Sequence, residues 1–488
     1  MGGEDKSASA REDSGDNNEE LNEEEEAKRR RGLLETHPGL DLAAQSRKMD
    51  GGRRISALLG GPEKVWRSPE PARIKTLLQL FNYGKWAAGG SGECVGQRSL
   101  DEDGEPGPYV WLTYDQVWAR AKAVGRGIAA LPGLRSGQAS SLGVSMRNCP
   151  DWLCLELGVY MSRRLFVPIF PTIEASTLAM MLKQTALEVL AVDSVERVQA
   201  LADHAAAVGA SKAWGPSLRH MIFCHQPSVP EAGGTKPDLG PLRKKLQGLG
   251  VKLMTLDEVV EQGGKAKELA ESGWSRPSDL ALICYTSGTE GESKGVLLSQ
   301  ANLVASASNV CTMVGRTTRV RQEDCVFSWI PLAHIQQRCV ELAALCRGAR
   351  IGYIHGKMSD YRQDMKVLKP TILVTVPRLL NDLFHSMYKD EGGLSKAVLK
   401  ISVWWKKKRS RDAQDNFYMR RRSLADKVVL KRRQEELGGA LRLVVTGSAP
   451  VQAEVVKKLR LILGCVVVQG YGAARRPPGP SLSPTRRT

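Results

Sequence analysis

The sequence predicts an α/β fold of mostly parallel sheets covered by helices. From residue 111 onward, short apolar runs alternate with stretches of helical periodicity, which is typical of a parallel sheet buried on both faces. The chain has 488 residues, of which 42% are hydrophobic and 25% are charged. This length and composition are those of a globular enzyme with a large core.

The expected elements follow one another along the chain. Residues 1–60 run from an acidic cluster into basic and glycine-containing polar sequence, so we expect a disordered, charged extension there. Apolar positions at helical spacing predict a helix within 74–86, and Thr113 is suited to cap the next helix. Further strands are expected at 142–146, 166–170, 189–192, 221–223 and 251–256, with helices beginning near Asp151 and around 178–187.

The stretch 280–299, LALICYTSGTEGESKGVLLS, joins a predicted buried strand (280–285) to a loop suited to bind polyphosphate. The loop offers hydroxyls, glycines and a final lysine that can meet phosphate oxygens: Thr286, Ser287, Gly288, Thr289, Gly291 and Lys294. Ser299 is suited to cap a helix beginning near Ala301. A solvated turn rich in small residues is the alternative. The loop is not a Walker A loop, because serine precedes the lysine and glycine follows it.

Two later stretches are further candidates for binding. His334 follows a predicted strand at 326–330, at the edge where α/β folds place ligands, although a lone histidine is by default structural. A predicted strand at 441–445 runs into the sequence TGSAP at 446–450. Small residues there would let a flat base lie against the backbone, and a tight turn before a helix explains the composition equally well.

The loop resembles the YTSGTTGxPKG phosphate loop of the acyl-adenylate-forming (AMP-dependent synthetase/ligase) superfamily, with Glu290 in place of threonine and Ser293 in place of proline. Three other stretches resemble the long-chain fatty acyl-CoA synthetases. They are WLTYDQVWARAKAVGRGI at 111–128, the PLAH-x-x-x-R pattern at 331–338, and LKPTILVTVPRLLN at 368–381. The resemblance covers roughly residues 65–472.

This resemblance implies stacked sheets, the large N-terminal domain of the adenylate-forming fold, and a long-chain fatty acid–CoA ligase. ATP and a fatty acid would form an acyl-adenylate, and CoA would then give acyl-CoA, with Mg²⁺ as the metal. Lys294 and Thr289 would be catalytic, Thr286 would lie near magnesium, and His334 would line the path of the acyl chain. The implied nucleotide-binding residues are Thr286, Ser287, Gly288, Thr289, Gly291, Lys294, Gly447, Ser448, Ala449, Pro450, Tyr471 and Gly472.

The resemblance ends at Gly472. Arg475 stands where the family has its magnesium-binding glutamate, and 473–488 form a tail rich in proline and arginine that does not resemble the family. We therefore expect an extension at 1–60, an incomplete large domain at 61–472, no small C-terminal domain, and little or no adenylation by the chain as written. The alternative function is a non-catalytic nucleotide- or lipid-binding remnant of such a ligase.

The net charge of +17 is concentrated in part of the chain. Residues 396–433 contain 14 basic and 3 acidic side chains. Such a block can bind nucleic acid or anionic lipid headgroups, although a solvated face is the commoner explanation for a charge run. Trp404 and Trp405 directly precede KKKR, which favours a membrane surface. We therefore expect peripheral contact with an anionic membrane through 396–433 rather than nucleic-acid binding.

The remaining sequence features concern cellular location and metals. The chain has no run of about 18 apolar residues that would span a membrane, and residues 1–31 are too charged for a secretory signal. None of the ten cysteines forms a C-x-x-C pair. We expect an intracellular protein without a zinc site, cytoplasmic or peripheral on a membrane. The resemblance implies the endoplasmic reticulum.

Overall fold

The structure is a computed structural model that describes residues 74–101, 105–225, 237–286, 294–313, 319–356, 361–389, 393–409 and 426–470, together with two short strands near the N-terminus. The chain divides into two units, one of residues 1–64 with 486–488 and one of residues 65–485. In the first unit, β1 (Ser46–Lys48) and β2 (Arg54–Ser56) pair antiparallel. The rest of the expected extension lies outside the described residues.

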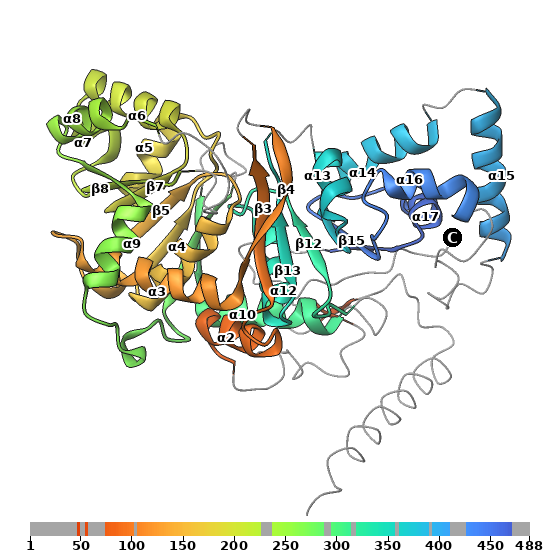
Figure 1. The fold of residues 1–488 in the computed structure, drawn as a ribbon, viewed down its shortest axis with the longest axis horizontal. Coiled ribbons are helices and arrows are strands. Elements are labelled where there is room, and N and C mark those ends of the chain that lie inside the picture. The colour runs from red at the N-terminus through yellow and green to blue at the C-terminus, as the bar shows by residue number, and fades with distance from the viewer. Residues whose placement is uncertain are drawn as a thin grey trace, which may run out of the picture. The chain divides into compact units, whose positions relative to one another are not determined.

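The second unit contains two seven-stranded sheets. The strand order is β11-β10-β6-β5-β7-β8-β9 in the first sheet and β16-β15-β14-β12-β13-β3-β4 in the second. Figure 1 labels β5, β7 and β8 of the first sheet and β3, β4, β12, β13 and β15 of the second. Pairing is antiparallel only between β10 and β11 and between β3 and β4, at one edge of each sheet. The mostly parallel α/β fold expected from the sequence is therefore confirmed.

The strands of the first sheet are β5 (Ser141–Ser145), β6 (Leu165–Pro168), β7 (Val189–Val192), β8 (His220–Phe223), β9 (Lys252–Thr255), β10 (Leu280–Thr286) and β11 (Lys294–Ser299). Those of the second sheet are β3 (Glu93–Leu100), β4 (Pro106–Thr113), β12 (Cys325–Ser328), β13 (Arg350–Tyr353), β14 (Ile372–Thr375), β15 (Leu443–Thr446) and β16 (Val466–Gln469). The strands expected at 166–170 and 326–330 each end two residues earlier, at Pro168 and Ser328.

Helices cover both faces of the first sheet, which explains its unbroken apolar strands. In β6, Leu165 and Val167 pack with α5 to α8, whereas Phe166 packs in the core that includes α3, α4 and α9. The helices are α2 (Leu77–Ala87), α3 (Tyr114–Ala130), α4 (Pro150–Met161), α5 (Ala175–Gln184), α6 (Val195–Val208), α7 (Ala210–Trp214), α8 (Gly240–Gly248), α9 (Leu256–Lys265), α10 (Gln300–Met313), α12 (Ile335–Cys346), α13 (Tyr361–Leu368), α14 (Pro377–Phe384), α15 (Gly393–Arg409), α16 (Lys431–Glu435) and α17 (Ala453–Leu463).

Helix starts are set by local capping. The Thr113 side chain accepts a hydrogen bond from the backbone of Gln116, whose own side chain accepts one from Thr113 N at 2.8 Å. This capping box satisfies two amides at the start of α3 and confirms the predicted cap. Ser299 likewise accepts from Asn302 N at 3.2 Å at the start of α10.

The hairpin of β3 and β4 has no counterpart among the strands predicted from sequence. Its strand β3 is buried because it pairs in parallel with β13, with Val95 opposite Ile351. That partner is more than 250 positions away in the sequence, and β3 itself includes polar residues such as Gln97 and Arg98. Within the described residues, no helix is both long and apolar enough to cross a membrane.

Candidate functional site

The predicted phosphate loop spans the tip of the β10–β11 hairpin. Thr286 ends β10 and pairs with Lys294, the first residue of β11. The Thr286 hydroxyl donates to the Lys294 carbonyl at 3.5 Å, and the Lys294 side chain is exposed. Both ends of the loop are thus held by one strand pair. The loop residues Ser287, Gly288, Thr289, Glu290 and Gly291 lie outside the described residues.

The predicted adenine turn follows β15, at the carboxyl edge of the second sheet. Ser448 has φ +74°, in the left-handed region that non-glycine residues rarely adopt. A Cβ atom on Gly447 would lie 2.9 Å from the Gly470 carbonyl oxygen, so glycine is required there for close approach of the chain after β16. Ala449 and Pro450 complete the turn. Tyr471 and Gly472 lie outside the described residues.

Gln336, in the first turn of α12, holds this turn in place. Its amide donates from Nε2 to the Thr375 carbonyl at 3.2 Å, and its Oε1 accepts from the Ser448 hydroxyl at 2.9 Å. Its side chain therefore joins the ends of β14 and β15. Nothing in the residues around Gln336 indicates its partners, which lie 39 and 112 positions away, so its role could not be predicted from sequence.

Two hydroxyls lie at the same strand ends. Thr375 and Thr446 are paired across β14 and β15 and are both fully buried. Neither hydroxyl oxygen has a hydrogen-bond partner within the described part of the chain. Buried polar groups are normally satisfied, so this edge of the second sheet has hydrogen-bonding capacity that the described residues leave unused.

His334 caps the N-terminus of α12. Its Nδ1 accepts a hydrogen bond from Gln336 N at 3.2 Å. Burial lowers the pKa of the His334 imidazole below its usual value, so the ring is neutral at pH 7 and carries its proton on Nε2. The preceding carbonyl, of Ala333, accepts from the Cys284 thiol of β10 at 3.6 Å. This contact brings β10, the strand that leads into the predicted phosphate loop, beside the His334 segment.

The segment 330–332 is held by Asn148, a residue just after β5 whose role the sequence did not reveal. The Asn148 amide donates to the Ser328 hydroxyl at 2.9 Å and to the Ile330 carbonyl at 2.8 Å, and accepts from Leu332 N at 2.9 Å. Asn148 is 5% exposed. The side-chain amide of this residue, next to the first sheet, thus satisfies three polar groups that follow or end β12 of the second sheet. It thereby fixes the backbone that leads to His334.

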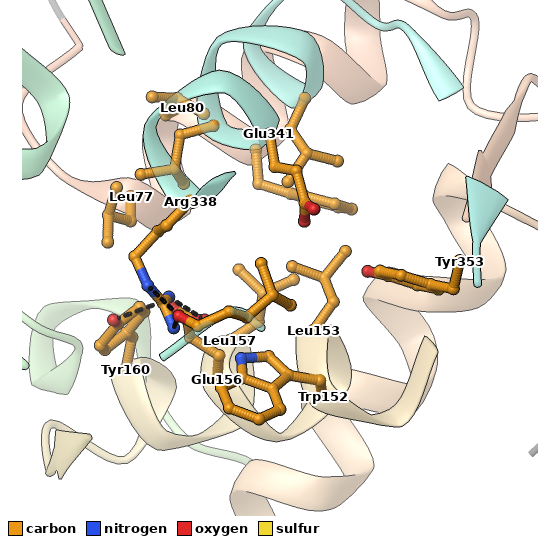
Figure 2. A pocket seen from close by; sticks show the side chains of 14 residues that line it. Leu77, Leu80, Trp152, Leu153, Glu156, Leu157, Tyr160, Arg338, Glu341 and Tyr353 are labelled. Atoms are coloured by element: carbon orange, nitrogen blue, oxygen red, sulfur yellow. Dashed lines mark hydrogen bonds and ion pairs between the residues drawn. The ribbon is translucent and has the colours of Figure 1, made fainter. Parts of the chain in front are cut away.

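A buried ion pair supports the same segment from α12. Arg338 pairs with Glu156 of α4, and the two side chains are 4% and 6% exposed. Arg338 also donates to the Leu332 carbonyl at 3.0 Å, and Tyr160 donates to Glu156 at 2.8 Å. Figure 2 shows this network at the wall of a small cavity. The arginine of the PLAH-x-x-x-R pattern is therefore structural, tying α12 to α4.

Metal-binding capacity can be tested on the described residues. No group of three or more His, Cys, Asp or Glu side chains within them is placed to hold a metal ion. Thr286, the predicted neighbour of magnesium, uses its hydroxyl to donate to Lys294. Donating this hydrogen bond leaves the lone pairs of the Thr286 oxygen available, and Arg475 lies outside the described residues.

Three stretches that are distant in sequence therefore meet at the carboxyl edges of two sheets. Such edges are where open α/β sheets bind their ligands. The family model described as "AMP-binding enzyme" matches residues 95–474. The chain belongs to the AMP-binding enzyme family.

The curated proteins to which this AMP-binding chain is similar include ligases and synthetases. It is 30% identical over 437 residues to long-chain-fatty-acid–CoA ligase 1 from Homo sapiens, covering 89% of this chain and 58% of that protein. It is 27% identical to long chain acyl-CoA synthetase 5 from Arabidopsis thaliana, covering 78% of this chain and 54% of that protein. The chain thus spans little more than half the length of these relatives.

Solved structures support the fold assignment. The adenylation domain of a carboxylate reductase from Mycobacterium chelonae matches 92% of this chain and 63% of its own, with a TM-score of 0.62 and 21% identity. A structure of the anthranilate CoA ligase AuaEII in complex with anthranoyl-AMP matches 82% of this chain and 60% of its own, with a TM-score of 0.57 and 16% identity. At these identities the likeness establishes the adenylate-forming fold of the large domain.

Proposed function

We propose that this chain binds ATP where β10, β14 and β15 end, and that the site serves the activation of long-chain fatty acids to acyl-CoA. The observation that carries the proposal is the convergence of three stretches through two contacts, Cys284 with Ala333 and Gln336 with Ser448. The names of the relatives support a long-chain fatty acid as the acyl substrate and CoA as the acceptor.

In this proposal each group acts on a different part of the substrates. Lys294 and the loop residues Ser287, Gly288, Thr289 and Gly291 would bind the β- and γ-phosphates, with Lys294 and Thr289 acting catalytically. Thr286 would lie near the magnesium ion that accompanies the nucleotide. Gly447, Ser448, Ala449, Pro450, Tyr471 and Gly472 would surround the adenine, and His334 would line the path of the acyl chain.

The proposed reaction has two steps that conserve atoms and charge. A fatty acid carboxylate oxygen attacks the α-phosphorus of ATP, forming the acyl-phosphate bond and releasing pyrophosphate. The CoA thiolate then attacks the acyl carbon, forming the thioester and releasing AMP. In the first step two anions must meet, so neutralisation by Lys294 and in-line positioning are the main contributions of the protein.

The alternative is a non-catalytic nucleotide- or lipid-binding remnant. Fatty-acid-dependent exchange between ATP and labelled pyrophosphate separates the two, because exchange requires reversible formation of the adenylate. Because Arg475 stands where the family has its magnesium-binding glutamate, we expect measurable ATP binding but little or no exchange from these 488 residues, which would favour the non-catalytic alternative for this sequence. Rapid exchange would show that these residues catalyse adenylation and would exclude the non-catalytic alternative. Absence of both exchange and nucleotide binding would contradict the proposed site.

Replacing Lys294 with methionine is expected to weaken ATP binding by about tenfold or more, because a charge-assisted contact is worth about 1.5–3 kcal/mol. AMP lacks the β- and γ-phosphates, so its affinity should change little. Titration calorimetry with ATP and with AMP measures both values. The control is Lys212→Met, which removes an exposed lysine of α7. Equal losses for ATP and AMP would contradict the assignment of Lys294 to the terminal phosphates.

Replacing Gln336 with alanine is expected to weaken ATP and AMP equally, by about tenfold. The substitution removes both hydrogen bonds that join the ends of β14 and β15, each worth about 1 kcal/mol, and frees the strained turn at Ser448. The same calorimetry measures the effect, with Gln247→Ala on the exposed surface of α8 as the control. Unchanged affinity for AMP would mean that the turn held by Gln336 does not bind adenine.

A further inference from the structure

One helix of the second unit presents an apolar face to solvent. On α15, the side chains of Val398, Ile401, Trp404 and Trp405 are 42%, 57%, 56% and 53% exposed. We call these four residues the α15 outer face. Among the described residues, eight large hydrophobic side chains are at least 39% exposed, and half of them belong to this single helix.

The opposite side of α15 is anchored, so the direction of the outer face is determined by packing. Leu399 and Val403 are 2% and 4% exposed and belong to the main core. Lys406 is 6% exposed, and its Nζ donates to the Leu461 carbonyl of α17 at 2.8 Å. Figure 1 shows α15 at the edge of this unit. The outer face therefore belongs to a helix whose opposite side is packed firmly against the rest of the unit.

Positive charge accompanies the outer face. Lys400 is exposed one position before Ile401, and Lys407, Lys408 and Arg409 form the C-terminal end of the helix. The wider segment 396–433 has 14 basic and 3 acidic residues. A helix with exposed indole and aliphatic groups beside basic residues is suited to lie in the interface of a membrane.

We propose that α15 docks on an anionic phospholipid bilayer, with its outer face entering the interface and its basic residues contacting lipid phosphates. The indoles of Trp404 and Trp405 would lie at headgroup level, with Val398 and Ile401 beside them in the acyl boundary. The helix would lie along the membrane surface. This docking involves no residue of the nucleotide site, so it stands or falls independently of the proposed reaction.

Two other occupants fit the outer face less well. Nucleic acid would use the basic residues and could stack on tryptophan, but Val398 and Ile401 gain nothing from bases. A second copy of the chain would bring two equally basic segments together, and like charges oppose association. A lipid surface matches both the apolar groups and the charge.

The test uses the full chain and vesicles of phosphatidylcholine, alone or mixed with phosphatidylserine. Co-sedimentation is expected only with phosphatidylserine present, and it should weaken strongly as salt is raised, because screening shortens the Debye length to about 3 Å at 1 M. Tryptophan emission should shift to shorter wavelength on binding. Equal binding to both vesicle types would contradict the charge-based docking.

Substitutions locate the contact. The double variant Trp404→Ser with Trp405→Ser is expected to bind anionic vesicles at least about tenfold more weakly, because interfacial burial of the two rings is lost. Trp86→Ser is the matched control, since Trp86 is 73% exposed on α2. Lys400→Glu should lower vesicle affinity at least about fivefold, because each basic residue near an anionic membrane contributes about 1 kcal/mol to binding. Lys212→Glu on α7 is its control.

Several outcomes would overturn the proposal. Unchanged vesicle binding in both the tryptophan and the Lys400 variants would remove the outer face from the contact. Binding to duplex DNA that is lost in the same variants would assign the face to nucleic acid. A dimer seen by sedimentation that dissociates in the tryptophan variant would assign it to a second copy. Lys400→Glu changes an exposed side chain, so it keeps the test valid if the tryptophan variant fails to fold.

Discussion

Replacing Arg338 with methionine is expected to lower the midpoint of urea unfolding by about 1 M, equivalent to about 3–5 kcal/mol. The substitution leaves the Glu156 carboxylate buried without its cation, since both side chains are at most 6% exposed. The substitution also removes the hydrogen bond that Arg338 donates to the buried Leu332 carbonyl oxygen. Urea titration followed by tryptophan fluorescence measures the change.

The double variant Arg338→Met with Glu156→Gln tests the cause. It is expected to recover much of the lost stability, because no uncompensated charge remains in the core. As a control, Lys265→Met removes an ion pair with Glu261 in which the side chains are 76% and 68% exposed, and exposed pairs contribute little. If Arg338→Met and Lys265→Met shift the midpoint equally, burial is not what makes the Arg338–Glu156 pair important.

Replacing Glu341 with glutamine is expected to remove a strong pH dependence of stability. Glu341 lies on α12 and faces the cavity shown in Figure 2, where its carboxyl and the Tyr353 hydroxyl point toward the same space. Burial raises the pKa of Glu341 to about 7, and hydrogen bonds from Ser328 and Gln337 only partly oppose this. Its contact with the Gln337 amide is 2.8 Å.

Linkage between ionisation and folding determines whether the free energy of unfolding rises or falls with pH. Below about pH 4.5, Glu341 is protonated in both the folded and the unfolded chain. Between pH 4.5 and about 7 the unfolded chain loses this proton while the folded chain keeps it, so the free energy of unfolding falls as pH rises. The total loss is on the order of 3 kcal/mol, and little further change follows above pH 7.

Urea midpoints measured from pH 4.5 to 8 test this expectation. The difference between the wild-type chain and Glu341→Gln should change in favour of the variant across this range, because glutamine cannot ionise. Glu174→Gln, at an exposed position before α5, is the matched control. A constant difference between wild type and Glu341→Gln at every pH would mean that Glu341 is already ionised in the folded chain.

The structure describes only some of the residues of the predicted site. The structure places Thr286, Lys294, His334 and the turn 447–450 at the carboxyl edges of the sheets, while the loop 287–291 and Tyr471 lie outside the described residues. Their assignments to phosphate, adenine and acyl chain remain predictions. Gln336 and Asn148 could not be found from sequence, since each acts on backbone groups of segments that only the fold brings near.

Features that depend on neighbours a few positions apart could be predicted from the residues alone. The Thr113 cap of α3, the Ser299 cap of α10 and the apolar run that became β10 were all predicted, because capping and periodicity act within one or two turns. Contacts between groups that are distant in sequence became evident only from the folded chain. Val95 lies opposite Ile351 in the second sheet, and Arg338 reaches Glu156, 182 positions away. Such pairings depend on the packing of whole sheets and helices, which no local pattern encodes.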